Sequence, residues 1–217
     1  MKVFDKISNI VLNHNIDKHK SKVREMYKNG DITIVSNNCL AGVIYSILGI
    51  QNCSPTINQW MKMADFLEFV KDLKFWMSCE LFEDHDESNK WNFPVGYLES
   101  SIDETKRIYI YMNHYNSFDE GKAKWEERKK RIIWDKVYVI FDFNDKDCDV
   151  SMLYEYDKLP IKNKIAIVHS DVRGLKHSYR MKCIGNNDPI VKEFEFDHMT
   201  GKRYFEEWDY VSFLNTP

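Results

Sequence analysis

The chain has 217 residues, 43% of them hydrophobic, which is enough to build one continuous core. Its 31 basic and 34 acidic residues leave a formal net charge of -3, so no global positive field attracts nucleic acid or an anionic membrane. No apolar run reaches the roughly 18 residues of a transmembrane helix, and the charged N-terminus does not resemble a secretory signal. We therefore expect a cytoplasmic protein with no transmembrane segment and no nucleic-acid partner.

Five cysteines are scattered along the chain and never form a CxxC pair. An odd number at irregular spacing favours neither a disulfide framework nor a zinc knuckle. We expect all five to be reduced thiols: Cys39, Cys53, Cys79, Cys148 and Cys183.

A helical arm is expected over residues 1–30, because apolar residues recur at helical spacing before the Asn29-Gly30 turn. The β-branched run at 32–35 predicts a short buried strand. A helix from Leu40 to Leu48 follows, with Gly49 as its C-terminal cap. Residues 36–39, Ser-Asn-Asn-Cys, therefore form a strand-to-helix turn.

Strands and helices continue through the middle of the chain. Apolar spacing predicts a helix over 66–77, while 79–101 is expected to be irregular, with a solvated acidic loop at 83–87. A strand at 108–112 precedes a helix that starts with a capping box of Ser117 and Glu120 and ends near residue 131. A strand, a helix and a strand then follow at 137–141, 150–159 and 165–168.

The last part of the sequence is less regular. Residues 178–184 and 191–196 are expected to be extended pieces that could pair antiparallel, and 204–214 a final helix. The preceding alternation of strand and helix predicts a three-layer α/β fold with a mostly parallel sheet and helices on both faces. Without a repeat or linker, we expect a single domain over residues 1–217.

Polar residues follow four of the predicted strands. The Ser-Asn-Asn-Cys turn follows the first strand, His114 the second, Asp142 the third and His169 the fourth. Ligands of open α/β sheets bind beyond the carboxyl ends of the strands, where helix N-termini offer unpaired amides. We therefore expect these residues to gather in one solvent-accessible hollow.

The turn after the first strand has two interpretations. Ser36, Asn37 and Asn38 could hold a phosphate against the helix N-terminus, or they could be ordinary capping residues. Cys39 could be a nucleophile whose pKa is lowered by the helix dipole, or a small buried apolar residue.

The other strand ends offer acid-base groups. His114 could act as a base or stabilise an anion, or it could be a half-buried structural histidine. Asp142 could orient an acceptor hydroxyl. His169 could bind substrate, although the polar residues after it favour a simple turn.

Two charged clusters are candidate binding sites. Asp142, Asp145, Asp147 and Asp149 resemble carboxylates that hold a divalent ion, but alternating aspartates are also common in turns. No metal ligand is assigned, and no cofactor is predicted. The basic residues of the helix at 117–131 alternate with glutamates, which indicates a solvated face, and only Arg128 is expected to point inward and bind substrate.

Several motifs together resemble the bacterial family known as DUF1919, whose members are often labelled exopolysaccharide-biosynthesis proteins. The resemblance covers Ile32 to Leu214 and implies an α/β fold and a cell-surface glycan context. It implies no particular reaction. Ser54 and Thr56 are further candidates for substrate binding. The motifs are ITIVSNNC with LAGVIY, SPTIN from Ser54, FPVGYL from Phe93, HYNSFDEGKAKWEERKKRI from His114, and GKRYFEEWDYV from Gly201.

The leading hypothesis is a transferase that modifies a surface polysaccharide or its precursor, using a sugar nucleotide or another phosphate-bearing donor. One alternative is a thiol-dependent acyl transferase or hydrolase, with Cys39 as nucleophile and His114 or His169 as base. Another is a glycan-pathway binding protein without chemistry. In each case a small molecule or a glycan is the expected ligand, and the oligomeric state is not predicted.

Overall fold

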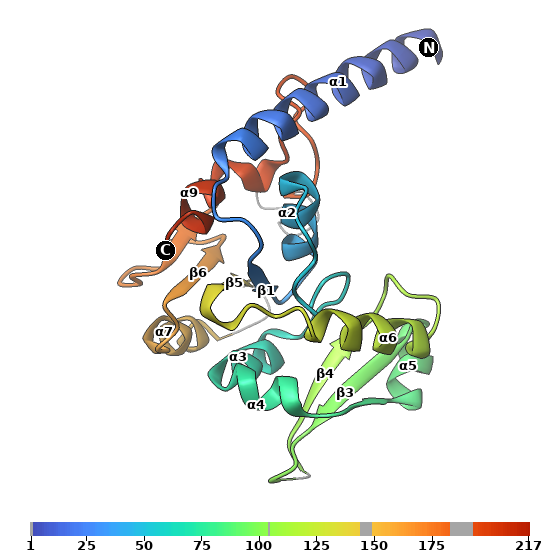
Figure 1. Cartoon of the computed structure of the whole chain (residues 1–217), viewed down its shortest axis with the longest axis vertical. Coiled ribbons are helices and arrows are strands. Elements are labelled where there is room, and N and C mark those ends of the chain that lie inside the picture. The colour runs from blue at the N-terminus through green and yellow to red at the C-terminus, as the bar shows by residue number, and fades with distance from the viewer. Residues whose placement is uncertain (1, 104, 144–148, 183–192) are drawn as a thin grey trace.

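The computed structural model describes residues 2–103, 105–143, 149–182 and 193–217, with side chains from residue 8 onward, and contains two β-sheets (Figure 1). The first sheet is entirely parallel and the second antiparallel. The parallel sheet has the order β1 (Thr33–Ser36), β5 (Val137–Phe143), β6 (Asn163–Val168) and β7 (Ser178–Arg180). The antiparallel sheet has the order β2 (Leu81–Glu83), β3 (Val95–Glu99) and β4 (Arg107–Tyr111).

Helices cover both faces of the parallel sheet (Figure 1). One face carries α1 (Lys2–Met26), α2 (Leu40–Leu48), the 3₁₀ helix η2 (Tyr204–Glu207) and α9 (Tyr210–Leu214). The other carries α3 (Met63–Lys71) and α7 (Ser151–Lys158). The other helices within the described ranges are α4 (Leu73–Ser78), α5 (His85–Trp91), α6 (Phe118–Lys129) and the 3₁₀ helix η1 (Trp134–Lys136).

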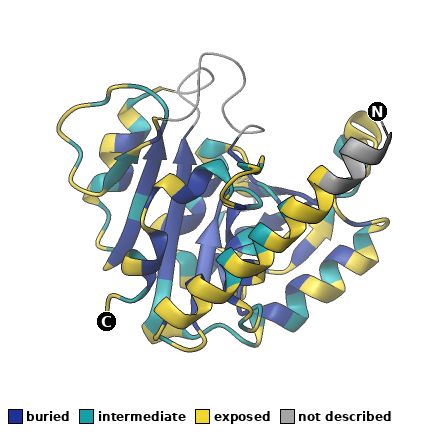
Figure 2. Cartoon of the chain, turned by 90° about the horizontal axis from the view of Figure 1, so that it is seen from above, coloured by how far each residue is buried: buried dark blue, intermediate teal, exposed yellow. Residues whose placement is uncertain are grey.

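Alternation along β5 divides the core into two clusters. Tyr138 and Ile140 pack on the side of α2 and the C-terminal helices, whereas Val139 and Phe141 pack on the side of α3 and α7. The second cluster also contains core residues of the antiparallel sheet, so the two sheets share buried side chains. The strands β1, β5 and β6 are accordingly almost wholly buried (Figure 2), whereas the edge strand β7 is half-buried to exposed.

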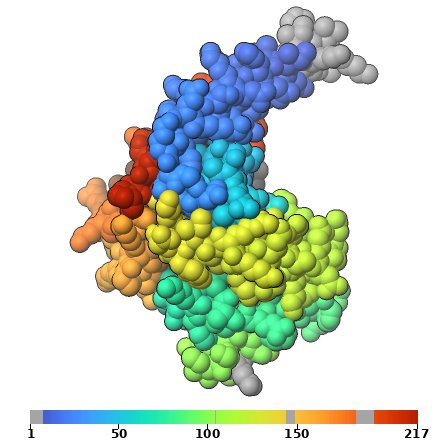
Figure 3. Space-filling model, in the orientation of Figure 1, coloured from blue at the N-terminus to red at the C-terminus, as the bar shows by residue number. Residues whose placement is uncertain are grey.

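The long helix α1 crosses α2 and extends beyond it (Figures 1 and 3). Arg24 of α1 donates hydrogen bonds to two carbonyls in the last turn of α2, Ile47 (2.9 Å) and Ser46 (3.3 Å). Gly49 ends α2 with a φ of 70°, a conformation that glycine adopts without a steric penalty. The Arg24 guanidinium and the Gly49 backbone N–H, with Gly49 in the left-handed conformation, together satisfy carbonyls at the C-terminal end of α2.

The predicted α/β class with a mostly parallel sheet and helices on both faces is confirmed. One strand was assigned wrongly: β4 does not join the parallel series but pairs antiparallel with β3. The reason is local, because a short connection links β3 and β4 directly and no crossover helix lies between them. The stretch 79–101, expected to be irregular, contains β2, α5 and β3, and Asp84 of its acidic run caps α5.

Other boundaries also differ from the prediction. The helix expected over 66–77 is broken at Asp72, whose carboxylate instead caps α4 by accepting from the Phe75 amide. In the C-terminal part, β7 is parallel to β6, while an antiparallel bridge joins Phe196 and Arg203. The final helix is divided into η2 and α9. No helix in the described ranges is long and apolar enough to span a membrane.

Candidate functional site

The loop between α2 and α3 joins the two sheets. Trp60 and Tyr111, the last residue of β4, exchange both backbone hydrogen bonds (3.0 and 2.9 Å), and the Met61 amide donates to the Asn37 carbonyl (2.9 Å). The same loop therefore touches the end of β4 and the turn after β1. This contact brings His114 near that turn, although their strands belong to different sheets.

Cys39 and His114 form a close pair. The Cys39 Sγ lies 3.2 Å from the His114 Nε2, and Cys39 is the residue that precedes α2. Burial raises the pKa of the Cys39 thiol, which is opposite in direction to the effect of the helix dipole in the nucleophile interpretation. The thiol consequently keeps its proton near neutral pH unless a base removes it, and the imidazole is within reach to do so.

A hollow of about 250 Å³ opens beside this pair. Its walls come from α1, α2, the α2–α3 loop and the C-terminal segment. The basic side chains Lys20 and Arg203 face it, as does Asn58. The complete lining is Ile16, His19, Lys20, Cys39, Gly42, Val43, Ser46, Ile47, Asn58, His114, Phe196, Gly201, Arg203 and Glu206.

The turn after β1 satisfies its own amides. The Ala41 amide donates to the Ser36 Oγ (3.1 Å), and the Leu40 amide donates to the Asn38 Oδ1 (3.0 Å). Ser36 and Asn37 are buried. Side chains of the turn thus cap the amides at the start of α2 that were expected to bind a phosphate.

Asp142 and His169 lie together on the inner side of this turn. The side-chain amide of Asn37 pairs with the backbone of Asp142, donating to its carbonyl (2.8 Å) and accepting from its N–H (2.9 Å). The Asn38 Nδ2 donates to the Asp142 Oδ2 (2.5 Å), and the His169 Nε2 lies 3.0 Å from the Asp142 Oδ1. Neither Asp142 nor His169 lines the hollow.

Ser54, Thr56 and Arg128 are buried, and none of them lines the hollow. The Ser54 and Thr56 hydroxyls are 3.0 Å apart, and the Ser36 amide donates to the Thr56 Oγ1 (3.5 Å). Arg128 does point inward, where it donates to the Ile57 carbonyl (2.9 Å) and to the Tyr115 Oη (2.8 Å). These contacts hold the segments that carry Asn58 and His114.

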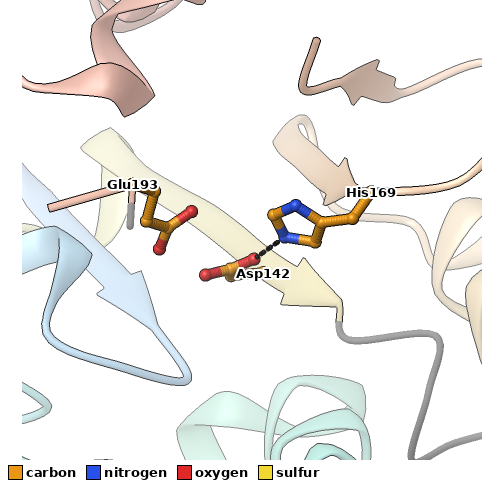
Figure 4. A group of neighbouring side chains, drawn as sticks. All are labelled: Asp142, His169 and Glu193. Atoms are coloured by element: carbon orange, nitrogen blue, oxygen red, sulfur yellow. Dashed lines mark hydrogen bonds and ion pairs between the residues drawn. The ribbon is translucent and has the colours of Figure 1, made fainter. Parts of the chain in front are cut away.

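The predicted single hollow is therefore divided into two neighbouring groups. Cys39 and His114 face solvent, whereas Asp142 and His169 form a buried group together with Glu193 (Figure 4). Glu193 was not predicted, because a single glutamate in an extended segment carries no distinctive pattern. Lys20, Arg203 and Asn58 were not predicted either, although Asn58 and Arg203 lie within motifs that carry the family resemblance. The Asp149 carboxylate accepts a hydrogen bond from the Ser151 amide at the start of α7, and Asp145 and Asp147 lie outside the described residues.

The family model named "Domain of unknown function (DUF1919)" matches residues 8–215. The chain belongs to this family. A Haemophilus influenzae relative described as "Uncharacterized protein" is 28% identical over 189 residues, which cover 86% of this chain and 85% of the relative. The family predicted from the motifs is confirmed, and neither comparison names an activity.

The DUF1919 match spans both groups of side chains described above, from the Cys39–His114 pair to Glu193. It also includes most of α1 and the C-terminal segment, which supply walls of the hollow. The region that defines the family therefore includes the complete candidate site.

Proposed function

We propose that the chain is a thiol-dependent acyl transferase or hydrolase, with Cys39 as nucleophile and His114 as general base. The observation that supports it is the 3.2 Å approach of the Cys39 Sγ to the His114 Nε2 at the edge of a hollow. A nucleophile in hydrogen-bond contact with a base, beside space for a substrate, is the arrangement that covalent catalysis requires.

In this mechanism the His114 Nε2 takes the thiol proton as the Cys39 Sγ attacks the acyl carbonyl. The leaving group departs with that proton, and a thioester remains on Cys39. An acceptor hydroxyl or water then attacks the thioester while His114 removes its proton, and the thiol is regenerated. Asn58, in the same hollow, offers its side-chain amide to the carbonyl oxygen on which negative charge develops.

The hollow also indicates the class of substrate. Lys20 and Arg203 line it, so we propose an acyl donor or acceptor that carries a phosphate or a carboxylate. As acceptor we propose a hydroxyl of a surface polysaccharide or its precursor, which rests on the family resemblance. We place the reaction in the cytoplasm, because Cys39, Cys53 and Cys79 are free thiols.

The test uses p-nitrophenyl acetate as an activated acyl probe and mass spectrometry of the digested chain. We expect an acetyl adduct on Cys39, formed at least about tenfold more slowly in His114→Ala, because general-base assistance typically contributes 10²–10⁴-fold. His85→Ala is the matched control, since His85 is exposed on α5 and does not line the hollow. Equal acetylation of Cys39 with and without His114, or preferential labelling of Cys53, would contradict the proposal.

A second candidate is a transferase that uses a sugar nucleotide, and the basic side chains in the hollow favour it. It makes a different prediction, because Cys39→Ser would leave transfer intact while Lys20→Met would weaken donor binding. Isothermal titration with nucleoside diphosphate sugars separates the two candidates. Binding without turnover in either assay would favour a non-catalytic binding protein.

A further inference from the structure

Three side chains from separate segments converge next to the turn after β1 (Figure 4). Asp142 lies near the end of β5, His169 follows β6 directly, and Glu193 begins the described C-terminal segment. Their nearest ligand-type atoms all lie within 4.8 Å of one another. Because β5 and β6 are parallel neighbours, their carboxyl ends emerge at the same edge, and the fold itself brings the first two residues together.

All three side chains are removed from solvent. Glu193 is 0% exposed, and the side chains of Asp142 and His169 are 0% and 7% exposed. Two carboxylates this close in a buried site carry a large desolvation cost unless protons or a cation balance their charge. One oxygen of the Asp142 carboxylate accepts from the Asn38 amide, and the other lies beside His169. Among the described residues, His169 is therefore the one side chain in contact with Asp142 that can carry a positive charge, and no lysine or arginine pairs with it.

His169 gives a second, independent indication. Its Nδ1 is buried and has no hydrogen-bond partner among the described residues. Buried ring nitrogens in native proteins almost always have a partner, so the contacts around this imidazole are incomplete without a further group. A histidine placed here for packing alone would not need to lie beside two buried carboxylates (Figure 4).

We propose that Asp142, His169 and Glu193 bind a divalent first-row transition-metal ion such as Zn²⁺ or Mn²⁺. Ligand atoms around such an ion, at bond lengths of about 2.0–2.2 Å, lie roughly 3–4.4 Å apart, which small side-chain adjustments reach from the observed spacing. An imidazole with two carboxylates suits these ions, whereas Ca²⁺ takes six to eight oxygen ligands.

The residues around the cluster would support the ion. Asn38 binds the second oxygen of Asp142, and Asn37 fixes the Asp142 backbone through two hydrogen bonds. Such outer contacts orient metal ligands and raise affinity. Because Cys39 follows Asn38 directly, the ion would also steady the turn that presents the thiol, although the metal site does not depend on thiol chemistry.

The test titrates Co²⁺, and then Zn²⁺ in competition, into the full chain after treatment with a chelator. We expect one ion per chain, with visible Co²⁺ absorption typical of nitrogen and oxygen ligands. Glu193→Gln and His169→Gln should each weaken binding at least about tenfold. His114→Gln, the matched control in the neighbouring hollow, should leave the affinity unchanged.

Several outcomes would overturn the proposal. The wild-type chain is decisive without any variant, because failure to bind Co²⁺ and Zn²⁺ would refute the site. Unchanged affinity in folded Glu193→Gln, with folding verified by circular dichroism, would do the same. A near-ultraviolet thiolate-to-cobalt band that disappears in Cys39→Ser would place the ion in the hollow instead. The acetylation assay of Cys39 tests the proposed thiol chemistry independently of this titration, so failure of one proposal is distinguishable from failure of the other.

Discussion

Cys39 and His114 are 75 positions apart in the sequence, and their contact depends on a few side chains around them. Burial, and not the start of α2, dominates the ionisation of the thiol. A half-buried thiol with a raised pKa, held beside an imidazole, resembles the serine–histidine arrangement more than a preformed thiolate–imidazolium pair. This distinction can be measured through the pH dependence of alkylation.

Cys39 should react with iodoacetamide as its thiolate. Because its pKa is raised, the thiolate fraction at neutral pH is smaller than that of a free thiol, and the rate should rise with pH to a midpoint above that of N-acetylcysteine. Cys53 and Cys79 are buried and should react more slowly than Cys39. The measurement is the rate of modification of each peptide against pH. A midpoint below that of the free thiol would indicate a thiolate–imidazolium pair.

Asp65 at the start of α3 offers a stability test. Burial raises the pKa of Asp65 to about 6, above its unfolded value of 3.8, so the folded state binds its proton more tightly. This contribution favours folding below the unfolded pKa and is lost as pH rises through about 6. Asp65→Asn should therefore stabilise the chain at pH 7 by about 1 kcal/mol, reduced from the full shift because Asp65 is partly exposed.

Thermal unfolding of the Asp65→Asn variant and of the wild type, measured from pH 7 down to the unfolded pKa of 3.8, checks the prediction. The gain in melting temperature should shrink as the pH falls towards the unfolded pKa. A gain that is independent of pH would show that ionisation of Asp65 is not its cause.

At the scale of elements, the site depends on contacts between segments that are distant in the sequence. Arg128 ties α6 to the α2–α3 loop and to the segment that carries His114. Gly201 allows the C-terminal segment to approach α1 closely. Each contact can be removed by one substitution, and each has a matched control elsewhere in the chain.

Replacing Arg128 by methionine should leave the buried Tyr115 hydroxyl oxygen without its donor, and the Ile57 carbonyl with the Tyr115 hydroxyl alone. The expected cost is about 1–3 kcal/mol of unfolding free energy, together with slower acetylation of Cys39 as His114 shifts. Lys124→Met on an exposed position of the same helix should change stability by less than about 0.5 kcal/mol. Urea unfolding gives both values, and equal effects of the two variants would argue against the positioning role of Arg128.

Gly201 has a φ of 70°, and a Cβ there would lie 2.4 Å from the backbone of Asn15 and Ile16 in α1. Gly201→Ala should therefore displace α1 and lower the unfolding free energy by more than about 2 kcal/mol. Gly174 has a φ of 84° but its nearest neighbour to a Cβ is 4.0 Å away, so Gly174→Ala should pay only the conformational cost of about 1–2 kcal/mol. Thermal unfolding compares the two, and a larger loss at Gly174 would contradict the steric explanation.

At the scale of the whole molecule, the N-terminal and C-terminal segments of the fold contact each other. Asn15 of α1 donates to the His198 and Met199 carbonyls, and Asn29 donates to the Leu214 carbonyl. The hollow lies between these terminal segments and α2, so it exists only in the complete fold. Both core clusters are built on β5, which should make unfolding cooperative.

Phe141 of β5 tests this cooperativity, because its ring contacts Phe66 of α3 and Tyr156 of α7. Phe141→Ala should lower the unfolding free energy by about 3–5 kcal/mol. The transitions followed by far-ultraviolet circular dichroism and by tryptophan fluorescence should shift together. Ile10→Ala, at a position that is 60% exposed on α1, should leave both unchanged. Separate transitions for the two probes would indicate that the clusters unfold independently.

The sequence by itself determined the local features. β-branched runs and apolar spacing specified β1, α2 and β5, Ser117 capped α6 as predicted, and the motifs identified the family. Arg128 was also placed inward correctly, since it falls on the same stripe as Gly121 and Trp125. These features depend on interactions between residues close in the chain, which the pattern records directly.

Only the tertiary structure decided how the strand ends are grouped. The sequence could not show that β4 belongs to an antiparallel sheet, nor that the α2–α3 loop brings His114 to Cys39 across the two sheets. It gave no indication that Glu193 joins Asp142 and His169. Strand pairing and the approach of distant segments depend on contacts between residues far apart in the chain, and a single sequence carries no local pattern for them.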